Sequence, residues 1–346
     1  MKQLGTSDIQ VPVICLGTMT WGQQNSEQDA HEQLTYAIEE RGLTFIDTAE
    51  MYPVPPETEK QGRTETYIGN WLKKRGKRDD LIIASKIGAG NFIGTRNVGE
   101  VPRYDRKSIR EAVEGSLKRL QTDYLDLYQV HFPERKTNFF GVRGYTHNEQ
   151  DDSTPIEETM QALAELVAEG KVRYLGVSNE TPWGLAEYLS VSQKLSLPKI
   201  VSIQNQYSLT NRTFEIGLAE MAIKEQVSLL AYSVLGMGVM SGKYLNGAQP
   251  EGARFTIFER NKDRYNPPRA QQAIQKYVDI ARSNNLDPSQ MAIAFALTRQ
   301  FMTSVIIGAT TLGQLKTNID AADIVLPQTV IDQIEQVHQD FPDVTH

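Results

Sequence analysis

The chain has 346 residues, of which 40% are hydrophobic and 23% are charged. This composition is typical of a globular protein with a full core, and it excludes a disordered or fibrous one. The 36 basic and 43 acidic residues give a formal net charge of −7, the wrong sign for a surface that follows nucleic-acid phosphates. One cysteine, Cys15, cannot form an intrachain disulfide. Because no apolar stretch resembles a signal peptide or a membrane span, we expect a cytoplasmic protein with no nucleic-acid and no membrane partner.

Eight short apolar runs recur along the chain, and each is too short for a helix. They lie at residues 13–16, 43–46, 81–84, 125–130, 172–177, 200–203, 228–231 and 304–307. Between them, apolar residues recur every three or four positions, as at Ile109, Val113, Leu117 and Leu120, which predicts amphipathic helices. Eight such alternations predict an α/β fold, a (β/α)8 TIM barrel, formed by residues 1–346 as a single domain.

The connections between these elements are asymmetric. Those from helix to strand are short, whereas the strand-to-helix loops at 52–62, 87–107, 132–155 and 234–268 are long. All strand-to-helix loops of a (β/α)8 barrel open at the same end, so we expect one active site there. Residues 4–11 are typical of a small hairpin closing the opposite end, and a last helix over 328–339 is expected outside the barrel.

A doubly wound open sheet is the alternative fold, because it also alternates strands and helices. Its dinucleotide-binding form needs Gly-x-Gly-x-x-Gly after an early strand. The nearest pattern here begins at Gly236 and Gly238, follows the seventh run, and has its third glycine one place late. The sequence therefore favours the barrel.

Polar residues stand at the ends of the second, third and fourth runs, namely Asp47, Lys86 and His131, and Tyr52 follows shortly after Asp47. Taken singly, Asp47 could cap a helix, Lys86 could lie in solvent and His131 could be a core histidine. In a barrel, however, these groups would meet at one rim.

Such a group of side chains suits one kind of chemistry. A phenol keeps its proton at neutral pH, a lysine beside it stabilises the phenolate, and a carboxylate keeps that lysine charged. An imidazole can donate a hydrogen bond to a carbonyl oxygen. The set fits a carbonyl that gains a hydride on carbon and a proton on oxygen, and because no side chain supplies a hydride, a cofactor is expected.

Several motifs closely resemble the aldo-keto reductase superfamily, and most closely its bacterial Tas-type members. They include Leu16-Gly17-Thr18-Met19, Phe45-Ile46-Asp47-Thr48-Ala49-Glu50-Met51-Tyr52, Ala84-Ser85-Lys86, the segment 116–131 ending at His131, and Gly176-Val177-Ser178-Asn179. The resemblance covers residues 4 to 340. It implies a (β/α)8 barrel, a nicotinamide cofactor bound without a Rossmann domain, and Tyr52 as general acid assisted by Asp47, Lys86 and His131.

The same resemblance implies a set of cofactor-binding residues. It places Ser178, Asn179 and Gln204 on the carboxamide, Tyr232 beneath the nicotinamide ring, Ser233, Leu235, Gly236, Gly238 and Lys243 at the pyrophosphate, and Arg254, Gly308, Thr310, Gln314 and Asn318 at the adenosine end, with Gly17, Thr18, Met19 and Asp47 completing the set. An arginine fork suits a 2′-phosphate, so NADPH is expected over NADH. The chain departs from aldose-reductase-type members, which carry Lys-Ser and an arginine where Gly308-Ala309 and Gln314 stand here.

Trp21, Met51 and Phe132, with Tyr52 and His131, are expected to form the substrate wall. The 132–155 loop, which contains Phe139, Phe140, Tyr145 and His147, is expected to be a substrate lid. The five histidines have no ligand spacing, so no metal is expected. Cys15 is expected in the core.

The sequence therefore predicts an NADPH-dependent reductase of small aldehyde or ketone substrates. The alternative is an NADP(H)-sensing regulatory or binding subunit with little turnover, because the chain also resembles potassium-channel β subunits. A third possibility, an isomerase or lyase using Lys86 as a Schiff-base amine, conflicts with a charged Lys86 held by Asp47.

Overall fold

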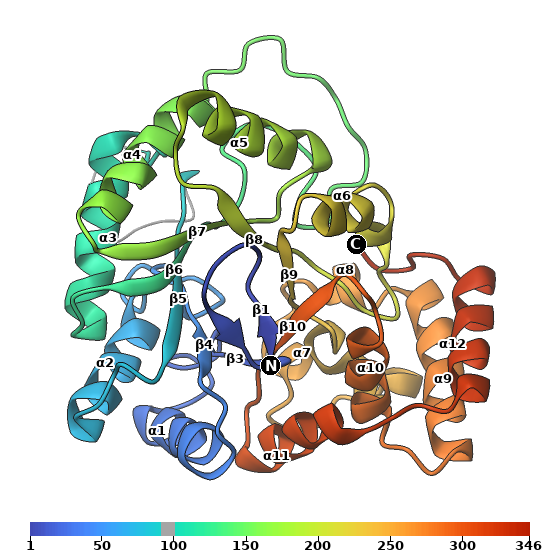
Figure 1. Cartoon of the computed structure of the whole chain (residues 1–346). Coiled ribbons are helices and arrows are strands. Elements are labelled where there is room, and N and C mark those ends of the chain that lie inside the picture. Colours follow the sequence, from blue (N-terminus) through green and yellow to red (C-terminus); the bar gives the residue numbers. More distant parts are fainter. Residues whose placement is uncertain (91–100) are drawn as a thin grey trace.

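The computed structural model describes residues 1–90 and 101–346. Eight parallel strands form a closed barrel in the order β10-β3-β4-β5-β6-β7-β8-β9 (Figure 1). The strands are β3 (Ile14–Gly17), β4 (Phe45–Asp47), β5 (Ile82–Ile87), β6 (Leu125–Val130), β7 (Val172–Ser178), β8 (Ile200–Gln204), β9 (Ser228–Ala231) and β10 (Met302–Ile307). The predicted (β/α)8 barrel is confirmed.

Each predicted apolar run contains or overlaps one of these strands, because runs rich in β-branched residues are buried on both faces of a parallel sheet. The ring closes between the first and last barrel strands, where Ile14 pairs with Val305 and Leu16 with Ile307. Cys15 is fully buried in β3, in the core position that the sequence predicts.

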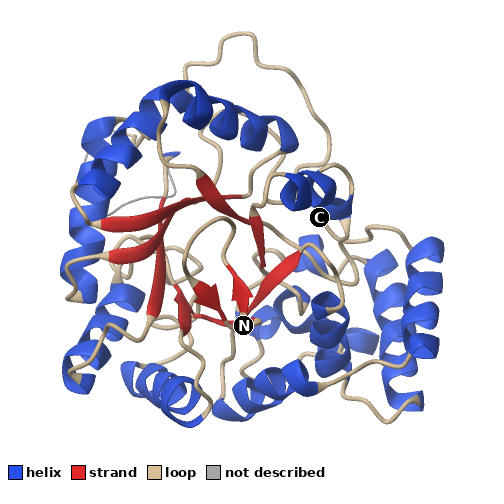
Figure 2. Ribbon diagram, viewed as in Figure 1, coloured by secondary structure: helices blue, strands red, loops and turns tan. Residues whose placement is uncertain are grey.

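The predicted N-terminal hairpin consists of β1 (Lys2–Gln3) paired antiparallel with β2 (Gln10–Val11). Its buried residues Leu4, Ile9 and Val11 form a core cluster with inward-facing residues of the barrel strands. Gly5 adopts φ +55° and lies so close to Val201, at the start of β8, that a Cβ would fall 2.3 Å from the Val201 carbonyl oxygen. The hairpin therefore closes the amino end of the barrel, and Figure 2 shows it lying across the centre of the ring.

Helices surround the barrel (Figure 2). The α-helices are α1 (Glu27–Thr35), α2 (Arg63–Arg75), α3 (Arg106–Leu120), α4 (Ile156–Ala168), α5 (Pro182–Leu195), α6 (Leu218–Lys224), α7 (Arg254–Ile257), α8 (Lys262–Tyr265), α9 (Pro268–Ser283), α10 (Pro288–Leu297), α11 (Leu312–Asp320) and α12 (Gln328–Asp340). A π-helical turn, η1 (Tyr36–Glu40), extends α1, and the 3₁₀ turns are η3 (Thr213–Glu215), η4 (Gly236–Ser241), η5 (Leu245–Gly247) and η6 (Ala321–Asp323).

The last helix, α12, lies beside α9 outside the ring of strands, as Figure 1 shows. Tyr277 of α9, Phe295 of α10 and Ile334 of α12 belong to one buried cluster separate from the main core. The predicted helix over 328–339 is thus confirmed in its position. The β9-to-β10 connection carries two long helices, α9 and α10, in place of one.

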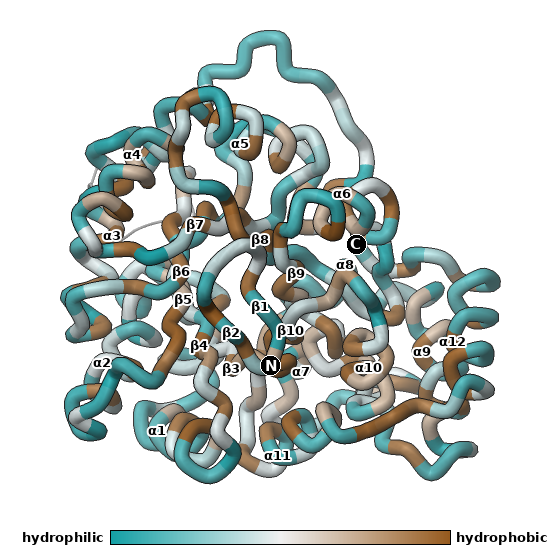
Figure 3. Tube along the Cα trace, in the orientation of Figure 1, coloured by the Kyte–Doolittle hydropathy of each residue, from teal (hydrophilic) through white to brown (hydrophobic). Residues whose placement is uncertain are grey.

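The long strand-to-helix connections lie at the carboxyl end of the barrel. The loop after β6 forms the green arch of Figure 1 and is mostly hydrophilic in Figure 3, whereas the strands are largely hydrophobic. Of the loop expected over 87–107, residues 91–100 lie outside the described part of the chain. Within the described residues, no helix combines the length and hydrophobicity that crossing a membrane requires.

Candidate active site

A cavity of about 800 Å³ opens at the carboxyl end of the strands. Its wall includes, of the residues predicted from the sequence, Gly17, Thr18, Met19, Asp47, Met51, Tyr52, His131, Ser178, Asn179, Gln204, Tyr232, Ser233, Leu235, Gly238, Lys243, Arg254, Gly308, Thr310, Gln314 and Asn318. Residues at or after the ends of seven strands, all but β5, thus meet around one space. Its volume lies in the range of small-molecule and cofactor sites.

Lys86 joins two of the predicted catalytic side chains beneath this cavity. Its ammonium lies 2.5 Å from Asp47 Oδ2, 2.8 Å from the Thr48 carbonyl oxygen and 3.5 Å from the Tyr52 hydroxyl. Asp47 ends β4 and Lys86 lies on the adjacent β5, so strand pairing sets their separation. Lys86 is fully buried and Asp47 nearly so, which makes this a desolvated ion pair that contacts a phenol.

The electrostatics of this group follow from burial and charge. Burial alone would lower the pKa of Lys86, but the Asp47 carboxylate and Tyr52 outweigh it, so the net pKa lies above the ordinary lysine value. Burial raises the pKa of Tyr52, and the nearby Lys86 charge opposes part of that rise. At neutral pH Lys86 is therefore charged and Tyr52 holds its proton.

His131 faces the cavity directly after β6. Its ring lies edge-on to the Tyr52 ring, with 5.8 Å between centroids. Burial, together with the Lys86 charge, brings the pKa of His131 well below its ordinary value, so the imidazole is neutral at pH 7. Its Nδ1 is buried and has no hydrogen-bond partner among the described residues. A neutral imidazole beside a protonated phenol can polarise a carbonyl oxygen without donating its only proton.

Two glutamines support the carboxylate of Asp47. Gln204 Nε2 lies 2.8 Å and Gln129 Nε2 3.3 Å from Asp47 Oδ1, and Gln204 also donates to Gln129 Oε1. Gln129 is a site residue that the sequence analysis missed. Its position on β6, two residues before His131, placed a polar side chain on the same inward face, which was the available signal.

The ends of β7, β8 and β9 gather amide and hydroxyl groups on the opposite wall. Asn179 Nδ2 donates to the His131 carbonyl oxygen and to Ser178 Oγ, and the Tyr232 hydroxyl donates to Asn179 Oδ1 at 2.5 Å. Ser178 Oγ in turn donates to the Gln204 carbonyl oxygen. Amide and hydroxyl groups, the kinds of donor and acceptor with which a carboxamide can pair, therefore lie next to the predicted catalytic side chains.

A second group of predicted residues forms a cationic wall after β9. Gly236 and Gly238 have φ +53° and +95°, and a Cβ on Gly238 would fall 2.9 Å from Lys243 Nζ. The Arg254 side chain donates to Gln24 Oε1 and to the Val54 carbonyl oxygen. Within the described part of the chain, neither Lys243 nor Arg254 has a carboxylate at ion-pair distance. Burial lowers the pKa of both groups.

These observations fit a dinucleotide with phosphate groups. The glycine after β9 leaves room for Lys243 to lie over bare backbone, and two cations without carboxylate partners face the cavity. At its far end, Gly308 leaves open space, because a Cβ there would meet only the Gly17 carbonyl oxygen at 3.7 Å. This end of the cavity is also lined by Thr310, Gln314 and Asn318. The main-chain N–H of Thr310 donates a hydrogen bond to Gln314 Oε1.

The predicted substrate wall is only partly on the cavity surface. Met51 lines the cavity, as does Phe140 of the predicted lid. Trp21 does not: it is fully buried and its indole donates to Gln33 Oε1. Phe132 is buried behind the surface, where its ring stacks on Phe139 at 5.7 Å and lies 5.5 Å from His131. Bulky apolar side chains next to a site can thus serve as its support.

Several other predicted residues also lie away from the cavity surface. Lys86 and Gly236 lie behind the cavity surface and do not line it. In the predicted lid, Tyr145 is 63% exposed and its hydroxyl is hydrogen-bonded to His147 Nδ1. Neither of these two residues lines the cavity. No group of three or more potential metal ligands occurs in the chain apart from residues 91–100, which were not searched.

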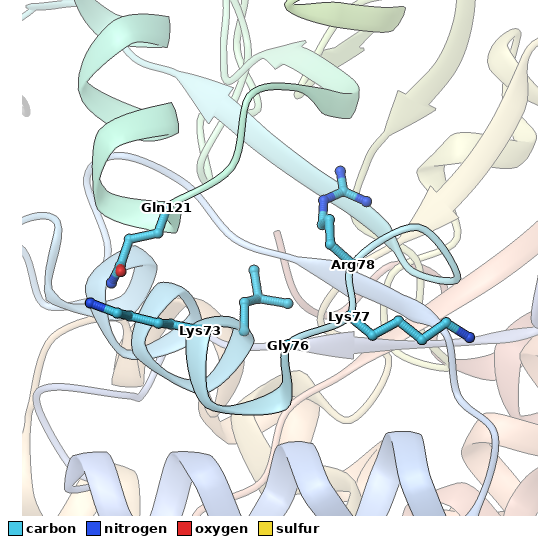
Figure 4. Close-up of a pocket in the computed structure, with 6 residues that line it drawn as sticks. Lys73, Gly76, Lys77, Arg78 and Gln121 are labelled. Carbon is cyan, nitrogen blue, oxygen red and sulfur yellow. The ribbon is translucent and has the colours of Figure 1, made fainter.

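A smaller depression lies at the other end of the barrel (Figure 4). It is lined by Leu72, Lys73, Gly76, Lys77, Arg78 and Gln121. The half-buried Arg78 already has partners, because it pairs with Asp126 at 2.7 Å and also donates to two main-chain carbonyl groups. None of the site residues predicted from the sequence lines this depression.

Comparisons with known proteins identify the family of this chain. A sequence model of the Aldo/keto reductase family matches residues 13–339. Protein tas of Escherichia coli (strain K12) is 54% identical over 333 residues, covering 96% of both chains. An Aldo-keto reductase of Babesia bovis is 32% identical over 76% of this chain and 97% of its own. The uncharacterized oxidoreductase YrpG of Bacillus subtilis (strain 168) is 28% identical, with 96% and 94% covered. The chain therefore belongs to the aldo/keto reductase family, as an oxidoreductase of carbonyl groups that uses a nicotinamide cofactor.

Proposed function

We propose that the protein reduces aldehydes or ketones with NADPH and that Tyr52 is the general acid. The observation that carries this proposal is the fully buried Lys86, which contacts both the Asp47 carboxylate and the Tyr52 hydroxyl at the base of the cavity. Burying an ammonium costs desolvation free energy. Asp47 already balances the charge of Lys86, so the phenol is not needed for that purpose. The value of the ammonium lies in stabilising the phenolate that forms when Tyr52 gives up its proton.

The cofactor, when bound, supplies a hydride to the carbonyl carbon. His131, held neutral by burial, donates a hydrogen bond to the carbonyl oxygen and holds it near the Tyr52 hydroxyl. Tyr52 transfers its proton to that oxygen, and Lys86 stabilises the resulting phenolate. Asp47 keeps Lys86 charged throughout, with its carboxylate fixed by the two glutamines.

Ser178, Asn179 and Gln204 would hold the carboxamide of the nicotinamide, and Tyr232 would stack beneath its ring. The preference for NADPH over NADH rests on Arg254, which is only 8% exposed and, among the described residues, donates hydrogen bonds only to neutral oxygens. An arginine in this setting matches a 2′-phosphate in charge and geometry. Arg254 would take over the role of the Lys-Ser pair and the arginine of aldose-reductase-type members, where this chain has Gly308-Ala309 and Gln314.

The test is the loss of nicotinamide absorbance when purified protein is mixed with NADPH and a panel of aldehydes and ketones. We expect turnover by the wild type, and at least a roughly 100-fold lower kcat for Tyr52→Phe with NADPH still bound. Tyr67→Phe, on α2 outside the cavity, is the matched control and should keep wild-type turnover. Normal turnover by Tyr52→Phe would show that another group is the acid. NADPH binding without turnover on any carbonyl would favour a sensor or binding subunit instead.

A further inference from the structure

An ion pair between Arg135 and Glu180 adjoins two residues of the proposed site. Glu180 follows Asn179 at the end of β7, and Arg135 lies shortly after His131 in the loop that follows β6. Arg135 Nη1 donates to Glu180 Oε2 at 3.1 Å, and its Nη2 donates to Glu180 Oε1. The side chains of Glu180 and Arg135 are only 2% and 14% exposed, and neither residue lines the cavity. The pair is therefore a bidentate, desolvated contact outside the cavity.

The main chain at Asn179 has a conformation that needs support from its neighbours. Its φ is +55°, in the left-handed region that residues other than glycine adopt at a cost in free energy. The Asn179 N–H donates to the Gln204 carbonyl oxygen at 3.0 Å. The Asn205 side chain exchanges two hydrogen bonds with the main chain of Glu180, at 3.1 and 2.9 Å. The ion pair with Arg135 fixes the side chain of Glu180 as well, and so completes the support on this side of Asn179.

The two segments that the ion pair joins also meet inside the site. Asn179 Nδ2 donates to the His131 carbonyl oxygen at 2.8 Å, and Asn179 Oδ1 accepts from the Tyr232 hydroxyl. A short segment leads from His131 to Arg135, and a single peptide bond leads from Asn179 to Glu180. The ion pair thus closes a small ring of chain around the hydrogen bond between Asn179 and His131. Its loss would remove a restraint on both of these residues.

The surrounding residues leave room for the pair and orient it. A Cβ on Gly184, in the first turn of α5, would clash with both Glu180 Oε1 and Arg135 Nη2. The Thr181 N–H donates to Glu180 Oε1 at 2.6 Å. The guanidinium carbon of Arg135 lies 4.8 Å from the centre of the Trp183 ring. Each charged group therefore has a further partner, and these partners fix the geometry of the pair.

We propose that Arg135 and Glu180 are positioning residues, whose ion pair holds Asn179 in the orientation that receives the carboxamide of the nicotinamide. This inference rests on the proposed function. Because the pair lines no part of the cavity, it acts through Asn179 and affects only the nicotinamide end of the cofactor. The residues after β9 and β10, to which we assign the pyrophosphate and the adenosine, do not depend on it.

The experiment compares the binding of NADPH with that of 2′-phospho-ADP-ribose, which has the same adenosine and pyrophosphate parts but no nicotinamide. In Arg135→Met we expect the Kd for NADPH to rise about tenfold, because the carboxamide loses well-placed hydrogen-bond partners. The Kd for 2′-phospho-ADP-ribose should stay within about twofold of the wild-type value. Calorimetric titration measures both constants without relying on turnover.

A double variant separates positioning from stability. Arg135→Met leaves the Glu180 carboxylate buried without its counter-ion and therefore also destabilises the fold. The double variant Arg135→Met/Glu180→Gln removes both charges and should regain most of the lost free energy of unfolding. It should nevertheless bind NADPH about tenfold more weakly than the wild type, because the bidentate contact is still absent.

Asp126→Asn is the matched control. Asp126 is also a buried carboxylate in an ion pair with an arginine, at 2.7 Å from Arg78, but it lies at the amino end of β6. Neither residue of that pair lines the cavity. The variant should bind NADPH and 2′-phospho-ADP-ribose as the wild type does.

Equal weakening of NADPH and 2′-phospho-ADP-ribose in Arg135→Met would overturn the inference, because it would indicate a general loss of structure. Wild-type affinity for NADPH in the double variant would overturn it as well, since the pair would then serve stability alone. Either result leaves the proposed function standing as long as the wild type reduces carbonyl compounds with NADPH. A wild type that does not bind NADPH would refute the proposed function and the inference together.

Discussion

Lys86 and Asp47 face each other on adjacent barrel strands, with 2.5 Å between ammonium and carboxylate, and both are almost completely removed from solvent. The attraction between two such charges offsets the cost of desolvating them only while both are present. The pair therefore has a structural role in addition to the catalytic one that we propose, and the two roles can be separated by experiment.

Replacing Lys86 with Met should lower the free energy of unfolding by about 3–5 kcal/mol, because Asp47 then remains buried without its counter-ion. The double variant Asp47→Leu/Lys86→Met should recover part of this loss. Denaturant titrations followed by fluorescence measure the free energies of unfolding of the single and the double variant. Lys171→Met, which breaks the partly exposed pairs with Glu114 and Glu169, is the control and should cost less than about 1 kcal/mol. A Lys86 variant as stable as the Lys171 variant would contradict this view of the pair.

His131 should make the stability of the protein depend on pH in the acid range. Its pKa in the folded state is lowered well below the ordinary value by burial and by Lys86, so below pH 6.5 the unfolded chain binds a proton there that the folded chain does not. Stability should therefore be full above pH 6.5 and fall with decreasing pH, by at most about 1.4 kcal/mol per pH unit.

The measurement is the free energy of unfolding of wild type and His131→Leu at pH 7.5 and 5.5. The wild type should lose more stability than the variant over this interval. His338 and His346, whose pKa values burial also lowers, are present in both proteins and cancel in the comparison. Equal losses would mean that His131 titrates normally in the folded protein.

Arg254→Met should weaken NADPH binding about 10- to 100-fold and NADH binding by less than about threefold, because only NADPH carries the 2′-phosphate. Quenching of protein fluorescence by each cofactor gives the two Kd values. A parallel loss for both cofactors would place Arg254 at the pyrophosphate, or would show that its bonds to Gln24 and Val54 are needed to shape the cavity.

Gly238→Ala should impair cofactor binding through Lys243. A Cβ at this position would displace the Lys243 ammonium, which lies 2.9 Å away, and NADPH should bind about tenfold more weakly. Gly247 also has a positive φ, +74°, but a Cβ there would meet nothing within 4 Å. Gly247→Ala therefore controls for backbone strain alone, and it should bind NADPH as the wild type does. Similar NADPH affinity in the two variants would exclude displacement of Lys243 as the cause.

The sequence predicts the strands well because both faces of each are buried. Residues 125–130 form β6 as expected, and the ends of the other runs differ from those of their strands by no more than three residues. The run expected at 43–46 becomes β4 at Phe45–Asp47, since the π-helical turn of residues 36–40 is followed by a tight turn through Gly42. Register against neighbouring strands, which local patterns do not encode, decides such boundaries.

The site is most predictable where a residue lies at or just after the carboxyl end of a strand. Asp47, Lys86 and His131 satisfy that condition, and the barrel brings them together. Trp21 illustrates the opposite case: it lies close in sequence to the site, yet its contact with Gln33 turns the indole into the core. Arg264 lines the cavity but was not predicted to do so, because its place depends on the path of a long loop and on contacts with Phe140 and His346, which are distant in sequence.

The closure of the ring between β3 and β10 has a consequence for biosynthesis. Ile14 has its partner in Val305, and the hairpin before it packs on residues near Val201 and Ser228. During translation, the first seventeen residues therefore leave the ribosome long before any of these partners exists. Their apolar side chains therefore lack these partners until almost all of the following residues have been synthesised.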